Sequence, residues 1–153
     1  RGETIMPSAS MVGSLRPLLL SPYFGSLTKD QQLKLLDGFW RGLRDIMKEA
    51  FDDPKKFVIQ KGVGVTVLHT ILVQVIEIAR SKGLSPLEPD TYSKLLRKPL
   101  AALQGENQHG ETVGGLEFWK IAPDGAAGSY SSSAGKRVFA AKLRQLLPEV
   151  EIE

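Results

Sequence analysis

The stretch from Val63 to Lys82 reads Val-Gly-Val-Thr-Val-Leu-His-Thr-Ile-Leu-Val-Gln-Val-Ile-Glu-Ile-Ala-Arg-Ser-Lys, and its pattern decides the fold. Its many β-branched residues favour a strand by propensity. Its polar residues, however, follow one another at spacings of 4, 4, 3 and 4 positions, which aligns them on one side of a helix: Thr66, Thr70, Gln74, Glu77 and Ser81. The segment is therefore predicted to be a helix buried on most sides, ended by Gly83 as its C′ residue.

His69 lies just beside this polar line. A lone histidine on a buried helix is more often a hydrogen-bonded core residue than a ligand, so we expect a core role and keep a functional role as the alternative. The apolar run from Val63 to Ala79 is interrupted by His69, Gln74 and Glu77, and we judge it too short for a membrane span. A cytoplasmic protein without a membrane partner is the expectation.

Two helices are predicted on the N-terminal side of this segment. Residues 8–20 show helical spacing, and Pro17 is expected to end or kink that helix near Leu15. The run Thr28-Lys29-Asp30-Gln31 has the form of a capping box and predicts an amphipathic helix that continues to about Ala50. Its apolar stripe is Leu33, Leu36, Trp40, Leu43 and Met47, widened by Leu35, Phe39 and Ile46.

A third, short helix is predicted to start at Asp53-Pro54, because an acidic cap precedes Pro at the first helical position. After the central segment, Asp90 is expected to cap a helix from Thr91 to about Gln104 that is kinked or restarted at Pro99. Its core residues would be Leu95, Leu96, Leu100 and Leu103.

The C-terminal third alternates Gly-rich stretches with apolar ones. Residues 105–115 are polar and lack a period, so we expect an exposed connection that is functional or mobile. A second small-residue stretch, 125–135, precedes the last helix. The predicted buried stripe of that helix is Val138, Phe139, Leu143, Leu146 and Leu147.

The composition fits one globular domain. The chain has 153 residues, a formal charge of +3, 42% hydrophobic and 24% charged residues, and no cysteine. The lack of cysteine excludes thiol catalysis, Cys-ligated zinc, iron–sulfur clusters and disulfides. The fold class predicted for residues 1–153 is mainly α: a single-domain helical bundle of five or six helices around a buried central helix, with Gly-rich loops. Because the chain begins Arg1-Gly2-Glu3-Thr4, we expect it to be the C-terminal fragment of a longer protein.

The most suggestive site runs from Gly128 to Arg137 and opens the last helix. Small residues let backbone N–H groups approach an anion, and a helix N-terminus adds partial positive charge. The run is not a Walker A loop, because Gly128 lies too early and Arg137 replaces the hydroxyl that would bind magnesium. The predicted phosphate or nucleic-acid contacts are Ser131, Ser132, Ser133, Lys136, Arg137 and Arg144. The alternative is a flexible hinge followed by a solvated basic helix face.

Metal and catalytic sites are not indicated. His109 with Glu106 and Glu111 lacks a second histidine, and the pair Asp52 and Asp53 is better explained by helix capping. We therefore expect no catalytic residues, no metal and no cofactor, and no enzyme activity from this fragment alone. Four aromatic residues are expected in the core and not in a base-stacking platform: Trp40, Trp119, Phe118 and Tyr23. Trp119 is the mild exception, because the basic residue Lys120 follows it.

The run from Phe51 to Gly64, Phe-Asp-Asp-Pro-Lys-Lys-Phe-Val-Ile-Gln-Lys-Gly-Val-Gly, follows a Trp-bearing amphipathic helix and precedes a hydrophobic one. This arrangement resembles the C-terminal half of DGQHR-domain proteins, bacterial proteins of which some are associated with DNA phosphorothioation and its transcriptional control. The similarity also includes the Gly/Ser stretch before the last helix. The naming signature is absent, because Asp37-Gly38 continues as Phe-Trp-Arg. The resemblance thus implies that the signature lies in a missing N-terminal part, and no family residue is transferred.

Two functions from different classes follow. The chain is either a non-catalytic, regulatory module of a DNA-associated protein, binding nucleic-acid phosphates or the missing N-terminal domain, or part of an enzyme. In the second case the loops 105–115 and 125–135 would close over a substrate held by that domain. A third hypothesis is docking or self-association, as in a homo-oligomer, through exposed apolar residues of 15–24.

Overall fold

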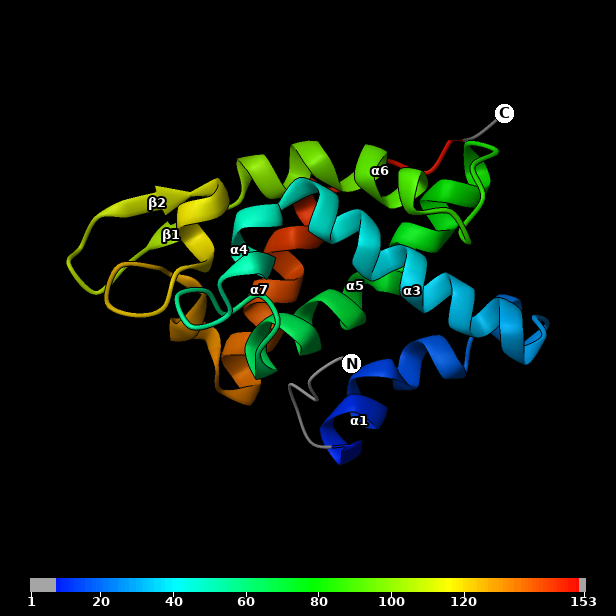
Figure 1. Cartoon of the computed structure of the whole chain (residues 1–153), viewed down its shortest axis with the longest axis horizontal. Coiled ribbons are helices and arrows are strands. Elements are labelled where there is room, and N and C mark those ends of the chain that lie inside the picture. The colour runs from blue at the N-terminus through cyan, green and yellow to red at the C-terminus, as the bar shows by residue number, and fades with distance from the viewer. Residues whose placement is uncertain (1–7, 152–153) are drawn as a thin grey trace.

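Helix α5 (Gly62–Ser81) runs through the middle of the molecule, and the other helices lie around it (Figure 1). The computed structural model describes residues 8–151. The remaining helices are α1 (Ser8–Leu19), α2 (Pro22–Gly25), α3 (Lys29–Ile46), α4 (Lys48–Asp52), α6 (Pro89–Ala102) and α7 (Ser133–Leu146). Two strands, β1 (Gln104–Glu106) and β2 (Thr112–Gly114), and two 3₁₀ turns, η1 (Gly115–Trp119) and η2 (Ala127–Tyr130), complete the fold. The predicted mainly α domain around a central helix is confirmed.

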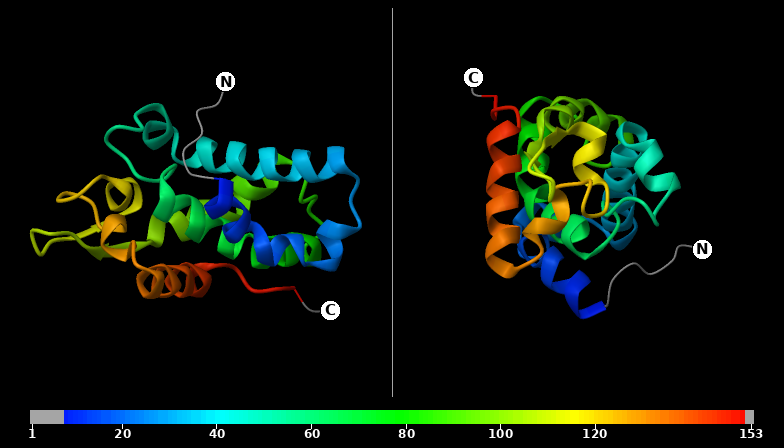
Figure 2. Two further views of the ribbon diagram at one scale, coloured as in Figure 1. Left: turned by 90° about the horizontal axis from the view of Figure 1, so that it is seen from below. Right: turned by 90° about the vertical axis from the view of Figure 1, so that its left-hand side faces the viewer.

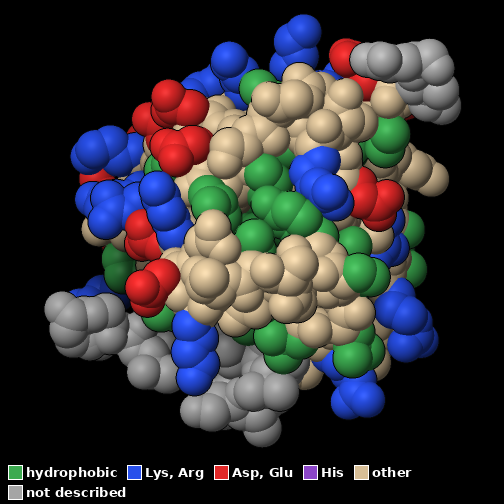
Figure 3. Space-filling view, turned by 90° about the vertical axis from the view of Figure 1, so that its right-hand side faces the viewer, with side chains coloured by type: hydrophobic (Ala, Val, Ile, Leu, Met, Phe, Trp, Pro, Cys, Tyr) green, Lys and Arg blue, Asp and Glu red, His purple; other side chains and the backbone are tan. Residues whose placement is uncertain are grey.

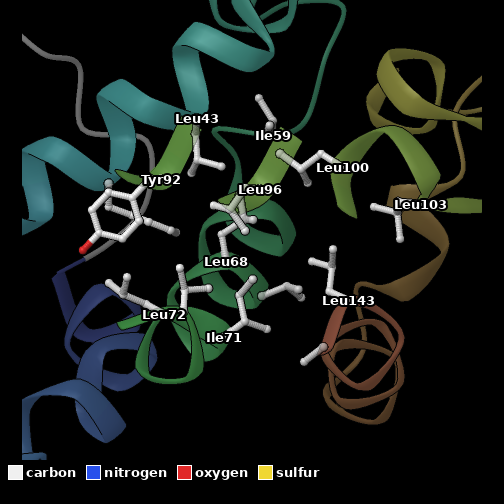
Figure 4. Close-up of a cluster of buried hydrophobic side chains, with 14 of the residues drawn as sticks. Leu43, Ile59, Leu68, Ile71, Leu72, Tyr92, Leu96, Leu100, Leu103 and Leu143 are labelled. Atoms are coloured by element: carbon white, nitrogen blue, oxygen red, sulfur yellow. The ribbon is translucent and has the colours of Figure 1, made fainter. Parts of the chain in front are cut away.

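The core lies between two layers of helices. Helix α3 packs along α6, whereas α1 and α7 pack against α5. Figure 4 shows Leu68 and Leu72 of α5 facing Leu43 of α3 and Leu96 of α6, with Leu143 of α7 beside them. All five side chains are fully buried. The core is therefore built from residues that are far apart in sequence.

The predicted polar line of α5 lies at its less buried edge. Glu77 is exposed, and Thr66, Thr70, Gln74 and Ser81 are half-buried. The helix ends as predicted at Gly83, whose φ is +71°. Leu84 N–H donates to the Ala79 carbonyl at 2.9 Å and Gly83 N–H to the Arg80 carbonyl at 3.1 Å, which is a Schellman motif.

Length and composition would allow α5 to cross a membrane. The helix has 20 residues, and its most apolar 18-residue window has a mean hydropathy of 1.8, so length and interruption by themselves do not exclude a membrane span, contrary to the argument from the sequence. Its apolar surface has another explanation, because 67% of the apolar window is buried inside the protein. Helix α5 thus has the burial of a globular core helix.

Helix α3 begins with the predicted capping box, in which Thr28 N–H donates to Gln31 Oε1 at 2.9 Å and Gln31 N–H donates to Thr28 Oγ1 at 3.2 Å. It breaks at Met47, so the expected continuation to Ala50 is the separate helix α4. The buried face is also rotated from the predicted stripe, because Leu33 is 65% exposed. The centre of the buried face is instead Leu35, Gly38, Phe39, Gly42 and Leu43.

Glycines explain this rotation. A Cβ atom at Gly42 would lie 2.7 Å from Tyr92 Cβ and 2.7 Å from the Pro89 carbonyl oxygen. A Cβ at Gly38 would lie 3.0 Å from the Leu87 carbonyl oxygen. The backbone of α3 therefore approaches the start of α6 at distances that only glycine permits.

Neither Pro17 ends its helix nor Pro99 restarts its helix, so that part of the two proline predictions was wrong. Helix α1 continues through Pro17 and α6 through Pro99. Leu18, just after Pro17, and Leu100, just after Pro99, are both fully buried. Packing of these side chains holds the backbone helical despite the local cost of proline. Helix α6 is also not capped by Asp90: Glu88 occupies the N-cap position and Pro89 the first turn.

No helix begins at Asp53-Pro54. The chain turns over residues 54–56, and Phe57 forms an isolated antiparallel bridge with Lys120. Val58 N–H donates to the Trp119 carbonyl at 2.8 Å, and Ile121 N–H donates to the Lys56 carbonyl at 2.9 Å. These long-range backbone bonds override the local helix-start signal.

The predicted exposed connection 105–115 is a β-hairpin. Strands β1 and β2 pair antiparallel with Gly105 opposite Val113, and the hairpin extends from one end of the molecule (Figures 1 and 2). Asn107 Oδ1 accepts the backbone N–H groups of His109 at 2.9 Å and Glu111 at 3.0 Å. The side chain of Asn107 thus orders a loop that its composition suggested to be mobile.

Replacing Gly42 by Ala should destabilise the protein. The new methyl group would clash with backbone and Cβ atoms of α6, and such overpacking costs about 1–3 kcal/mol. Thermal or urea unfolding measures this loss. Gly13→Ala in α1 is the matched control, because nothing lies within 4 Å of its Cβ position. Since Ala is the better helix former, the control should be unchanged or up to about 1 kcal/mol more stable; equal effects at both sites would contradict the close approach.

Candidate nucleic-acid interface

Helix α7 lies along one side of the molecule and presents one face to solvent (Figure 2). It is anchored to the core by Phe139, Ala140 and Leu143, which are buried. Leu146 and Leu147 are half-buried, but Val138 is 58% exposed, so its predicted place in the buried stripe was wrong. The reason is that Val138 lies on the side of the helix opposite Leu143.

The start of α7 is fixed by a cap and a close contact. Ser132 Oγ accepts the backbone N–H of Gly135 at 2.9 Å, the usual N-cap bond. A Cβ at Gly135 would lie 2.8 Å from the Tyr130 carbonyl carbon, so η2 turns directly into α7. Of the three predicted serines, Ser132 uses its hydroxyl for the cap, while Ser131 and Ser133 are exposed.

Four basic residues and no acidic residue occur in α7: Lys136, Arg137, Lys142 and Arg144. Among the described residues, none of the four has a carboxylate within 4 Å. Arg144 Nε donates instead to Gln74 Oε1 of α5 at 3.3 Å. Elsewhere the bases are commonly paired, as in Arg41 with Asp37 at 2.7 Å and Arg97 with Asp45 at 3.1 Å. The four bases of α7 thus form no ion pair within the described part of the chain.

The acidic C-terminal tail does not cover this charge. Glu151 forms an ion pair with Lys82 at 3.4 Å, and its backbone N–H donates to Ser81 Oγ at 2.9 Å. Both partners lie at the end of α5. Glu77 of α5 lines the same shallow depression as Arg144 without forming an ion pair with it. The tail thus passes the depression that Arg144 lines, but Glu151 pairs with Lys82 of α5 and not with a base of α7.

His69 is the other polar feature that the sequence singled out, and it is a core residue. Trp40 Nε1 donates to His69 Nε2 at 2.9 Å, and Nδ1 lies 3.0 Å from Ser14 Oγ. Burial lowers the pKa of His69 to about 4, so the ring is neutral at pH 7. Because Nε2 accepts the indole proton, the ring proton resides on Nδ1 and points to the Ser14 oxygen. His69 cannot take a proton from Ser14 in this arrangement, which excludes a serine–histidine nucleophile.

The Gly-rich segment 105–115 is hydrogen-bonded to residues 123–124, which immediately precede the segment 125–135. Asn107 Nδ2 donates to the Asp124 carbonyl at 3.0 Å, and Gln108 N–H donates to the Pro123 carbonyl at 3.1 Å. Gly105 also packs closely against the second segment, because a Cβ at Gly105 would lie 2.8 Å from Phe118 Cε2 and 3.2 Å from Ala126 Cβ. A substrate enclosed between these segments would have to separate these contacts.

A larger depression of about 880 Å³ lies elsewhere, between α4, the end of α6 and η1. Its apolar lining includes Ile46, Met47 and Leu116, and its rim carries charged side chains that are partly paired. Within this rim, the hydrogen bond from Lys48 lowers the pKa of Asp52. Among the described residues that line this depression there is no histidine, serine or threonine that would act as a base or nucleophile.

A metal centre is not formed by the described residues, in which no group of three or more His, Asp or Glu side chains is close enough to hold an ion. His109 Nε2 lies 3.3 Å from Asp124 Oδ1, while Glu111 Oε1 accepts from Asn107 Nδ2 at 3.1 Å. Trp119, considered as a stacking residue, is fully buried beside Phe118 and Phe139. A base could not stack on it without opening the core.

The chain matches no protein-family model, no curated protein and no solved structure. Function is therefore inferred from the surface of α7, whose uncompensated charge is the clearest chemical feature among the described residues.

Protonation of His69 should make the protein less stable in mild acid. The pKa of this ring is near 6.5 in the unfolded chain and about 4 in the folded one, so the unfolded state binds the proton more tightly. The contribution of the neutral His69 ring to the free energy of unfolding is fully present above pH 6.5 and is lost as the pH falls towards 4. Between pH 7 and 5 the loss from this group should be about 2 kcal/mol.

Urea unfolding at pH 7 and pH 5 measures this difference. Glutamine at this position stays neutral. In His69→Gln, the drop in the free energy of unfolding between pH 7 and pH 5 should therefore be about 2 kcal/mol smaller than in the wild type. His109→Gln is the control, because the side chain of His109 is 51% exposed. An undiminished pH dependence in His69→Gln would contradict the assignment.

Proposed function

We propose that this chain is a non-catalytic helical module of a DNA-associated bacterial protein of the DGQHR type, and that it binds nucleic-acid phosphates through α7. The observation that supports the proposal is the set of four basic side chains on α7 that lack acidic partners. The family assignment rests on the resemblance of residues 51–64 and their flanking helices.

Physical chemistry supports a phosphate-binding role for such a surface. Bases that are already paired with carboxylates gain little from a phosphate, because the first ion pair must be broken. Unpaired arginines and lysines instead release counterions from the nucleic acid when they bind it. Arg137 and Arg144 are two helical turns apart, which is about 10 Å along the axis, so they would contact separate phosphates.

The alternative of a substrate site between the Gly-rich segments is less favoured, because Gly105 packs closely against Ala126 and the first segment is hydrogen-bonded to residues 123–124. Contact with a further domain remains part of the proposal. Leu19, Leu20 and Leu33 are exposed and would suit such a contact. Figure 3 shows hydrophobic side chains gathered on the end of the molecule where α3 begins.

Removing the two arginines should weaken nucleic-acid binding. For Arg137→Ala combined with Arg144→Gln, the slope of log K against log salt concentration should fall by about 2 in magnitude, since each phosphate contact contributes about one. Fluorescence anisotropy with a labelled duplex at several salt concentrations measures both the affinity and the slope.

The control is Lys55→Ala, because Lys55 is exposed in the turn after α4. Figure 2 shows this turn and α7 on opposite sides of the molecule. It should leave the slope unchanged. If the wild type bound no nucleic acid at about 50 mM salt, where electrostatic binding is strong, or if Lys55→Ala weakened binding as much as the arginine variant, the proposal would be wrong.

A further inference from the structure

We infer that α7 enters the major groove of double-stranded DNA, with a narrow crest of small side chains towards the base edges and basic side chains on both flanks. This inference rests on the proposed function and specifies the kind of nucleic acid and the mode of binding.

The crest follows from the order of exposed residues on α7. Successive residues in a helix are about 100° apart, so Ala134 and Ala141 project in nearly the same direction. Both are exposed and lie in the middle of the solvent-facing arc. Arg137 and Arg144 form the line on one side of this crest. The line on the other side is Val138 and Gln145, both exposed, with the half-buried Lys142 beyond it.

This arrangement places positive charge on both sides of a slim edge. When a helix lies in a groove, its two flanks face the two phosphate backbones that form the groove walls. Arg137 and Arg144 would contact one wall and Lys142 the other. Lys136 is half-buried at the start of the helix and would reach a phosphate only from the helix end.

The dimensions fit the major groove of B-form DNA. That groove is about 12 Å wide and the minor groove about 6 Å, whereas a helix with its side chains is about 10–12 Å across. The alanines of the crest make the side of α7 that faces the groove narrower than a helix of average diameter. The 14 residues of α7 span about 21 Å.

The exposed side chains are of the types that make contacts in that groove. Glutamine pairs with the edge of adenine, arginine with guanine, and alanine or valine methyl groups contact the methyl group of thymine. Gln145 and Val138 are both exposed beside the crest. They are therefore placed where a helix in the groove would meet base edges.

Single strands and RNA duplexes fit less well. Single-strand binding uses aromatic platforms, but Phe118, Trp119 and Phe139 are fully buried near α7. Tyr130 is half-buried and stacked on Phe118. The major groove of A-form RNA is too narrow to be read by side chains. B-form DNA is thus the partner that the surface favours.

The first test compares four probes at low salt by anisotropy: a DNA duplex, its single strand, an RNA duplex of the same sequence, and a DNA duplex with bulky groups on cytosine C5, which fill the major groove. The wild-type chain should bind the unmodified duplex at least about 10-fold more tightly than the other duplexes, the size of one good groove contact.

The second test changes the crest without changing charge. Ala141→Leu should weaken binding to the DNA duplex about 10-fold, which corresponds to about 1.4 kcal/mol, and leave binding to the single strand within about twofold. Ala102→Leu, at an exposed alanine of α6, is the matched control and should bind like the wild type. Circular dichroism confirms that both variants are folded.

The outcomes separate the two proposals. Equal binding to the DNA duplex, the RNA duplex and the groove-filled duplex would overturn the groove inference and leave phosphate binding in place. An unchanged duplex affinity in Ala141→Leu would also overturn it. Failure to bind any of the four probes would overturn the proposed function itself.

Discussion

The structure depends on the burial of α5, a helix whose surface is apolar except for one narrow polar line. Such a helix must be covered on several sides, because each exposed apolar square ångström costs free energy in water. Helices α1 and α7 cover it on two sides, and the layer of α3 and α6 covers it on a third. This requirement also places the candidate interface. Since Phe139 and Leu143 must face α5, the opposite side of α7, with Arg137 and Ala141, is directed to solvent.

One polar network crosses this apolar centre, and its geometry shows how a buried polar group is tolerated. His69 of α5 contacts Trp40 of α3 through one ring nitrogen and Ser14 of α1 through the other. Three helices that are distant in sequence thus share one imidazole. Both nitrogens have partners only when the ring is neutral, because a protonated ring could not accept the indole N–H. The network therefore favours the packed arrangement at neutral pH and gives no group that could act as a catalytic base.

The sequence predicted the elements whose signals are local. The polar spacing in α5, the Gly83 stop and the Thr28 capping box depend on residues within a few positions, and all three are confirmed. Errors arose where distant segments decide. The buried face of α3 depends on Gly38 and Gly42, which appear as gaps in an apolar pattern until α6 lies against them. The hairpin depends on the hydrogen bonds of Asn107, and Phe57 pairs with Lys120 across the fold.

The candidate surface on α7 could also be predicted only in part, because part of it depends on contacts between distant segments. The basic residues of α7 and the absence of acids between them are visible in the sequence, but their freedom from ion pairs is not. A net charge of +3 would be compatible with complete pairing, and the acidic tail after Pro148 is close enough in sequence to neutralise α7. Instead Glu151 binds Lys82 at the end of α5, while Asp37 and Asp52 pair with bases one turn away and Asp45 pairs with Arg97 of α6. The four bases of α7 therefore keep their charge without an ion pair among the described residues, and such a local group of positive charges attracts a polyanion.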